Sequence, residues 1–264
     1  MLQFIEVGNG DNTRKIAVEA RNGSGPPLVW LGGFRSDMRG SKAEILDEWA
    51  AVQGRACIRF DYSGHGESGG RFEEGTISRW CEEAVAVIEK FARERPILIG
   101  SSMGGWIALL ATRHLRENNP ALSPAGIVLV APAADFTERL MWAEFDESIR
   151  ATIMNEGVFI KPSLYSDEGY PITRALIEDG RNNLLLDDAI VTDCPVHILQ
   201  GMQDPDVPWR HALETMERMP SDNVVMTLVK DGDHRLSRPE DLDRLVAAVD
   251  RISRDIATAT GGGQ

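Results

Sequence analysis

The sequence predicts an α/β protein built on a doubly wound, mostly parallel sheet. Apolar runs without alternation are typical of strands buried on both faces. Such runs occupy residues 27–33, 56–61, 96–101, 125–132, 194–201 and 223–230. Between them, apolar residues recur with helical spacing, most clearly near 76–92 and 239–254. Buried strands that alternate with amphipathic helices indicate this fold class.

Three segments depart from the alternation. "LQFIEV" and "KIAVEA", separated by "GNGDNT", predict an N-terminal antiparallel hairpin. Residues 135–187 carry short amphipathic pieces without a strong buried strand, and this segment is too long for a structureless loop. We therefore expect a helical cap insertion at 135–187 within a core of 1–134 and 188–258. The end of the chain, 259–264, is expected to be a disordered tail.

Composition argues against several classes of partner. The 264 residues include 28 Lys and Arg and 41 Asp and Glu, which gives a net charge of −13. Nucleic acids and anionic membrane surfaces require a basic patch, so neither is expected to bind. No apolar run approaches the roughly 20 residues that span a bilayer, so no membrane insertion is expected.

The three cysteines indicate a reducing compartment. Cys57, Cys81 and Cys194 cannot form a paired disulfide framework, and their spacing fits no metal site. Cys57 and Cys194 are expected to be small core residues. The first residues lack the apolar stretch of a signal peptide. Together these features predict a cytoplasmic protein.

Ser102 is the predicted nucleophile. Residues 100–104, "GSSMG", match G-x-S-x-G between the apolar run "PILIG" and the helical pattern "GGWIALLATRHL". In this setting the chain turns sharply from strand to helix, and the central serine is strained, with its hydroxyl exposed above the sheet. Ser101 lacks glycines on both sides at the required spacing, so we expect it only to fill the turn.

A serine hydroxyl needs a base, and the base is a histidine oriented by a carboxylate. With this motif the acid and then the histidine follow the serine, on loops after later strands. His234, directly after the run 223–230, fits that place. His65 lies in a glycine-rich loop that could line the site, but it comes too early in the chain. The other histidines lie within predicted helices or strands: His114, His197 and His211.

Asp204 is the predicted acid, because it lies three residues after the glycine that ends the run 194–201. Asp206 also qualifies by position, but it is more typical of a turn or a helix N-cap. Asp233 is a weaker alternative, since the side chains of adjacent residues such as Asp233 and His234 seldom face each other.

Two backbone N–H groups are expected to bind substrate at the developing oxyanion. One belongs to Met103, the residue after the serine. The other should come from the loop after the run 27–33. There the pair Gly32-Gly33 lets the backbone approach the substrate, and we assign the second donor to Phe34.

One branch of the α/β-hydrolase superfamily resembles this chain from about residue 27 to 250. The resemblance is carried by "LGGFRSDMRGSKA", "ACIRFDYSGHGESGG", "ILIGSSMGGW", "GMQDPDVPW" and "DGDHRLS". The branch is the abhydrolase-domain subfamily, whose animal members are mitochondrial protein depalmitoylases and acyl-glucuronide esterases. "FDYSGHG" and "PSLYSDEGY" resemble this branch specifically. The resemblance implies an α/β-hydrolase fold with Ser102 as nucleophile, Asp204 as acid and His234 as base.

The predicted function is hydrolysis of a carboxylic ester or thioester through an acyl-enzyme on Ser102, with neither metal nor organic cofactor. The expected partner is a small-molecule or acylated substrate, and the protein is expected to be a monomer or a small homo-oligomer. A C–C bond hydrolase or a peptidase would use the same residues. A non-catalytic ligand-binding protein could share the scaffold.

Two features bear on the substrate. Arg35 could meet a substrate carboxylate or remain solvated. Five apolar residues of the insertion could line an acyl channel or simply pack onto the sheet: Met141, Trp142, Phe145, Ile153 and Phe159.

Overall fold

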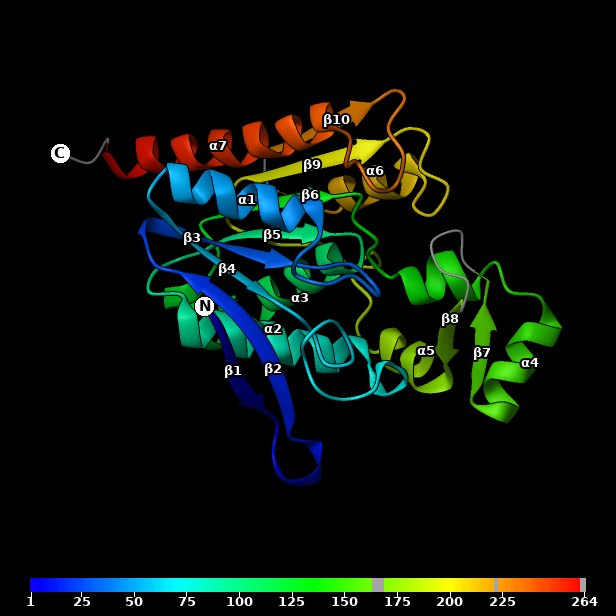
Figure 1. Cartoon of the computed structure of the whole chain (residues 1–264). Helices are drawn as coiled ribbons and strands as arrows, with labels where there is room; N and C mark the ends of the chain where they lie inside the picture. The colour runs from blue at the N-terminus through cyan, green and yellow to red at the C-terminus, as the bar shows by residue number, and fades with distance from the viewer. Residues whose placement is uncertain (163–168, 221–222, 262–264) are drawn as a thin grey trace.

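A computed structural model of the chain describes residues 1–162, 169–220 and 223–261 (Figure 1). Its main sheet has eight strands in the order β1-β2-β4-β3-β5-β6-β9-β10. The strands are β1 (Leu2–Val7), β2 (Arg14–Arg21), β3 (Ser24–Leu31), β4 (Arg55–Phe60), β5 (Ile97–Ser101), β6 (Gly126–Val130), β9 (Val196–Gly201) and β10 (Val224–Val229). Every apolar run that predicted a strand overlaps one of them.

The sheet is parallel from β4 to β10, and the first two strands are antiparallel. β1 pairs with β2 as the predicted hairpin, in a register that places Leu2 opposite Glu19. β2 is antiparallel to β4, whereas β4, β3, β5, β6, β9 and β10 pair in parallel. All residues of β5 and β6 are buried, as continuous apolar runs predict. The predicted fold class is therefore confirmed.

Helices cover both faces of the sheet (Figure 1). One face carries α1 (Ser41–Val52) and α7 (Pro239–Gly261), which pack apolar residues such as Leu46 and Val249 onto it. The other face carries α2 (Ile77–Phe91), α3 (Met103–Asn118) and α6 (Trp209–Glu217). This arrangement leaves the carboxyl ends of the parallel strands open to loops and to the insertion.

The insertion is not purely helical, and that part of the prediction is wrong. It contains a π-helical turn over Thr137–Trp142, then α4 (Glu147–Glu156) and α5 (Arg174–Arg181). It also contains an antiparallel hairpin, β7 (Val158–Lys161) and β8 (Tyr170–Thr173). Strand β7 has only four residues and none of them is fully buried, and its three apolar residues are too few to be told from a piece of an amphipathic helix. Figure 1 shows the insertion at the edge where the arrowheads of β5 and β9 point.

The end of the chain differs from the predicted tail. Residues 259–261 belong to the last turn of α7, and 262–264 lie outside the described residues. Most of "PSLYSDEGY" also lies outside them.

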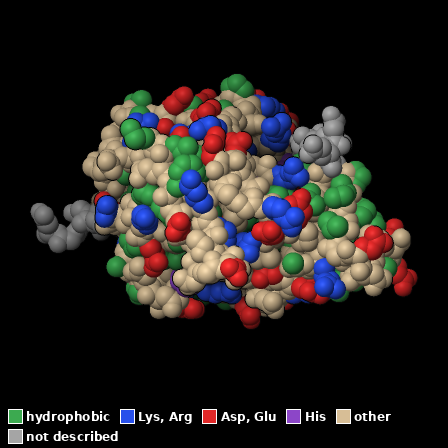
Figure 2. All heavy atoms as spheres, turned by 60° about the horizontal axis from the view of Figure 1, so that its bottom comes forward, with side chains coloured by type: hydrophobic (Ala, Val, Ile, Leu, Met, Phe, Trp, Pro, Cys, Tyr) green, Lys and Arg blue, Asp and Glu red, His purple; other side chains and the backbone are tan. Residues whose placement is uncertain are grey.

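Within the described ranges, no helix combines the length and apolarity needed to cross a membrane. Figure 2 shows Lys and Arg side chains interspersed with Asp and Glu over one face of the molecule.

Candidate active site

Ser102 lies in a strained turn between β5 and α3. Its φ of 54° and ψ of −119° lie outside the regions that L-residues favour, at a cost of about 1–3 kcal/mol. The flanking glycines are sterically required. A Cβ on Gly104 would lie 2.0 Å from the Leu31 carbonyl oxygen, and one on Gly100 would lie 2.3 Å from the Gly104 carbonyl oxygen. The motif therefore folds as its mechanics predict.

The structure brings together the three residues predicted as nucleophile, acid and base. The distance from Ser102 Oγ to His234 Nε2 is 3.1 Å, and from His234 Nδ1 to Asp204 Oδ2 it is 2.8 Å. An ionised carboxylate only accepts hydrogen bonds, so His234 Nδ1 carries the proton. The Nε2 atom is then free to accept the Ser102 hydroxyl proton.

Asp204 is held at several points. Its side chain has no solvent exposure. Oδ1 accepts the N–H groups of Asp206 (2.9 Å) and Val207 (2.8 Å). Oδ2 accepts Gln200 Nε2–H (3.2 Å) in addition to the His234 ring. The buried Gln200 amide on β9 thus orients the carboxylate, and no motif in the sequence pointed to it.

The loop that carries His234 is also anchored by a residue of α1. The Lys42 ammonium, at the start of α1, donates to the carbonyl oxygen of Arg235, the residue after His234. Burial lowers the pKa of Lys42 to about 8. Helix α1 was absent from the sequence prediction, so this contact was not expected either.

The alternatives to Asp204 occupy other roles. Asp233 accepts the Leu236 N–H at 2.9 Å, as a turn residue does. Asp206 is exposed, although its carboxylate lies within 4.8 Å of the ligand atoms of Asp204 and His234. Among the described residues, this trio is the group that could hold a metal ion. Both Asp204 oxygens, however, already accept hydrogen bonds within the protein.

The predicted oxyanion donors flank Ser102. After β3, the Ser36 N–H donates to the Gly33 carbonyl at 3.1 Å and closes a turn around Phe34. A Cβ on Gly33 would lie only 3.4 Å from Ser102 Cβ, so this backbone is next to the serine. Met103 is the first residue of α3, where N–H groups lack intrahelical acceptors and the helix dipole favours negative charge.

The insertion meets the site at the Phe34 ring. This ring contacts Phe72, Phe136 and Tyr170 edge-on, with centroid distances of 4.8, 5.8 and 6.0 Å. Tyr170 begins β8, so an aromatic contact joins the turn around Phe34 to the insertion.

Of the residues that could line a channel, Phe145 and Ile153 are buried in the insertion's own apolar cluster. Packing within the insertion is therefore their observed role. The Arg35 side chain lies over the rings of Phe72 and Tyr170.

The remaining histidines have distinct surroundings. His114 is exposed on α3. His197 and His211 are buried, and their Nε2 atoms bond Thr227 Oγ1 (2.9 Å) and the Ala134 carbonyl (2.7 Å). His65 is 4% exposed, and its Nε2 accepts the Arg35 N–H in the turn around Phe34.

The buried His65 predicts a pH dependence of stability. Burial, with a smaller effect of Arg35, lowers its pKa to about 4. In the unfolded chain its pKa is near 6.5, so at intermediate pH only the unfolded state binds the proton, and the free energy of unfolding falls as pH falls. Relative to a His65→Gln variant, the wild type should lose about 1 kcal/mol from pH 7 to about 5.5. Urea denaturation of both proteins measures this, and an unchanged difference would contradict it.

The site lies where the strand order of the sheet reverses. The chain leaves β3 for β4 on one side and later returns to β5 on the other. The turn around Phe34 follows β3 and Ser102 follows β5, at the place where open α/β sheets bind ligands. A parallel sheet with a serine turn after β5, and with the carboxylate and histidine after later strands, defines the α/β-hydrolase class.

Comparison with known proteins agrees with this class. The sequence profile of the alpha/beta hydrolase family matches residues 23–248, and the chain belongs to that family. The resemblance to the abhydrolase-domain branch is confirmed, because the chain is 34% identical over 251 residues to palmitoyl-protein thioesterase ABHD10 of Homo sapiens. That match spans 95% of this chain and 80% of the relative.

Two solved structures are similar over nearly the whole chain. A candidate hydrolase from Agrobacterium vitis S4 is 51% identical, with a TM-score of 0.93 over 96% of this chain and 98% of that one. Alpha/beta hydrolase domain-containing protein 10 from mouse is 31% identical, with a TM-score of 0.87 over 97% and 99%. The protein is accordingly a hydrolase of the α/β superfamily.

Proposed function

We propose that this protein cleaves a carboxylic ester or thioester through an acyl-enzyme formed on Ser102. The observation that carries the proposal is the hydrogen-bonded line Ser102–His234–Asp204, which begins at a strained serine. A strained serine conformation persists only where its surroundings impose it, and such strain is concentrated at functional sites.

The reaction has two acyl transfers. Ser102 Oγ attacks the carbonyl carbon while His234 Nε2 takes its proton, and Asp204 stabilises the imidazolium through Nδ1–H. The N–H groups of Phe34 and Met103 donate to the carbonyl oxygen as it becomes negative. His234 then protonates the departing thiol or alcohol. Water, deprotonated by His234, attacks the acyl-enzyme and restores Ser102.

A thioester with an apolar acyl group is our first choice of substrate. Relatives at about a third identity carry the name palmitoyl-protein thioesterase, and the aromatic contact of Phe34 with Tyr170 gives the site an apolar rim. A thiol is also a good leaving group, so little acid catalysis is needed to release it.

A substrate series tests this choice. We expect turnover of acyl thioesters and p-nitrophenyl esters with chains of four to sixteen carbons, and kcat/KM at least about 10³-fold lower for the matching anilides, because an amide needs much stronger help for its leaving group. Hydrolysis should be followed by thiol release or absorbance. Anilide cleavage as fast as ester cleavage would favour a peptidase and contradict the proposal. Cleavage of a C–C bond substrate, without turnover of any ester or thioester, would also contradict the proposal.

A further inference from the structure

We propose that His65 is a positioning residue for oxyanion stabilisation, because its imidazole holds the turn that presents the Phe34 N–H to the substrate. This inference rests on the proposed acyl transfer at Ser102. The position of His65 early in the chain argues against a role in proton transfer, and the structure places its ring in contact with the turn around Phe34.

The contact lies at the peptide directly after Phe34. The N–H of Arg35 donates to His65 Nε2 at 3.1 Å. His65 Nδ1 lies 3.1 Å from the Ser63 carbonyl oxygen, which can only accept, so Nδ1 carries the proton and Nε2 is the acceptor. Arg35 has a φ of 56°, which is unfavourable for a residue with a Cβ. The hydrogen bond to His65 therefore stabilises a turn conformation that the chain alone disfavours.

The imidazole is itself rigidly held. Its ring packs against Phe72 and Trp80, with centroid distances of 5.1 and 5.3 Å. The Ser63 carbonyl that it bonds also accepts Trp80 Nε1–H at 3.2 Å. The Ser63 N–H donates to the buried Glu83 carboxylate at 2.8 Å. A ring fixed by these contacts can hold the Arg35 peptide in one orientation.

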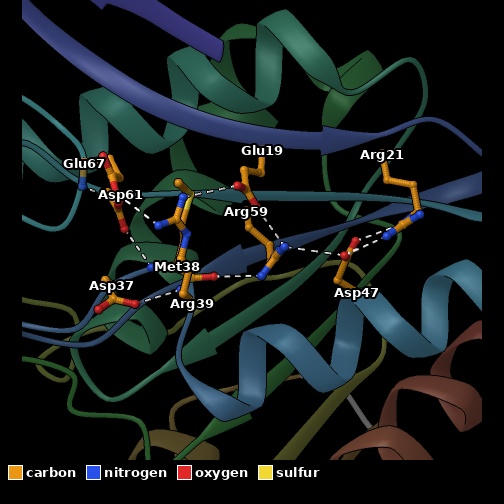
Figure 3. A network of polar contacts seen from close by, with 9 residues as sticks. All are labelled: Glu19, Arg21, Asp37, Met38, Arg39, Asp47, Arg59, Asp61 and Glu67. Atoms are coloured by element: carbon orange, nitrogen blue, oxygen red, sulfur yellow. Dashed lines mark hydrogen bonds and ion pairs between the residues drawn. The ribbon is translucent and has the colours of Figure 1, made fainter. Parts of the chain in front are cut away.

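A second anchor holds the same loop independently of His65 (Figure 3). Asp61 accepts the Met38 N–H at 2.7 Å, and Arg59 donates to the Met38 carbonyl at 3.0 Å. Asp61 also accepts the Glu67 N–H at 2.8 Å. The loop after β3 thus stays attached to the loop after β4 when His65 is changed. Loss of His65 is expected to disturb the turn around Phe34 and to leave the fold intact.

His65 remains an acceptor at neutral pH. Its burial disfavours the imidazolium and lowers its pKa to about 4. A protonated ring would carry N–H groups on both nitrogens and would face the Arg35 N–H with a second donor.

Two amide substitutions distinguish the hydrogen bonds made by the two ring nitrogens of His65. In His65→Asn the amide occupies the place of Nδ1, so it can still donate to Ser63 but leaves the Arg35 N–H unpaired. In His65→Gln the longer amide reaches the place of Nε2 and can accept from Arg35. We expect kcat on the best ester or thioester to fall about 10²-fold in His65→Asn with KM within about three-fold, since removing one oxyanion donor costs 10²–10³. His65→Gln should keep kcat at least about ten-fold above His65→Asn.

A transition-state analogue gives a second readout. The Ki of an alkyl trifluoromethyl ketone, which forms an oxyanion on the serine, should rise in His65→Asn by the same factor as kcat/KM falls. His114→Asn makes the same change at an exposed position and should leave both values unchanged. Melting temperatures of all variants report folding.

The outcomes are distinguishable. A wild type that hydrolyses no acyl substrate would overturn the proposed function and this inference with it. If the wild type is active and His65→Asn and His65→Gln have equal kcat values, the inference about His65 is overturned and the proposed function stands. This holds whether both kcat values are normal or both fall together with the melting temperature.

Discussion

Replacement of Ser102 by alanine is expected to lower kcat about 10⁶-fold and to leave the melting temperature within a few degrees of the wild type. The variant lacks the atom that the proposed mechanism acylates, and His234 cannot replace it from its position 3.1 Å from the hydroxyl oxygen. Alanine has the same Cβ as serine and meets the same strain at φ 54°, so the turn that the surrounding backbone imposes is retained. Initial rates on the best substrate, together with thermal unfolding, measure both quantities.

Ser101→Ala is the matched control, because Ser101 is buried at the end of β5 and precedes the nucleophile by one residue. Its kcat should stay within about ten-fold of the wild type, as expected for a residue outside the reacting set. Activity above 1% in purified Ser102→Ala would contradict the assignment of the nucleophile.

The second large effect is expected from Asp204→Asn, which should lower kcat about 10⁴-fold with little change in KM. The cause lies in the contacts of the carboxylate. Two backbone N–H groups, from Asp206 and Val207, point at Oδ1 and will select the amide oxygen of asparagine there. The amide NH₂ then faces His234 Nδ1, which must become the acceptor. The imidazole proton moves to Nε2, which can no longer accept the Ser102 proton.

Asp206→Asn is the comparison for this variant. The Asp206 carboxylate is exposed and lies near His234, but the ring bonds Asp204 Oδ2, so Asp206→Asn should cost at least about 10²-fold less kcat than Asp204→Asn. Steady-state kinetics of both variants decide between the two aspartates. A larger loss in Asp206→Asn than in Asp204→Asn would mean that the catalytic acid has been assigned to the wrong residue.

The central sheet and the serine turn could be predicted because each leaves a local pattern. Strands buried on both faces read as continuous apolar runs, and the turn at Ser102 admits only glycine at positions 100 and 104. The hairpin β7–β8 and the helix α1 left no comparable pattern. Only Ala43, Leu46 and Ala50 of α1 are buried, and β7 is partly exposed throughout.

The residues that hold the site in place could not be predicted from the sequence either, and the reason differs from the one given for β7–β8 and α1. His65, Gln200 and Lys42 act on backbone or side-chain atoms that are distant in the sequence, such as the Arg35 N–H and the Arg235 carbonyl. A glutamine in a strand or a lysine in a helix has no motif that reveals its partner. Chain order pointed to Ser102, Asp204 and His234, but it carried no information about the residues that hold these three side chains and the turn around Phe34 in place.

The most direct test of Ser102 as the nucleophile is the reaction of the purified protein with a fluorophosphonate probe, followed by mapping of the modified peptide by mass spectrometry. The probe reacts only with an activated serine. We expect one adduct, on Ser102, that persists in Ser101→Ala, is absent in Ser102→Ala and forms far more slowly in Asp204→Asn. An adduct on Ser101, or a folded wild type that does not react, would contradict the claim that Ser102 is the nucleophile of a working hydrolase.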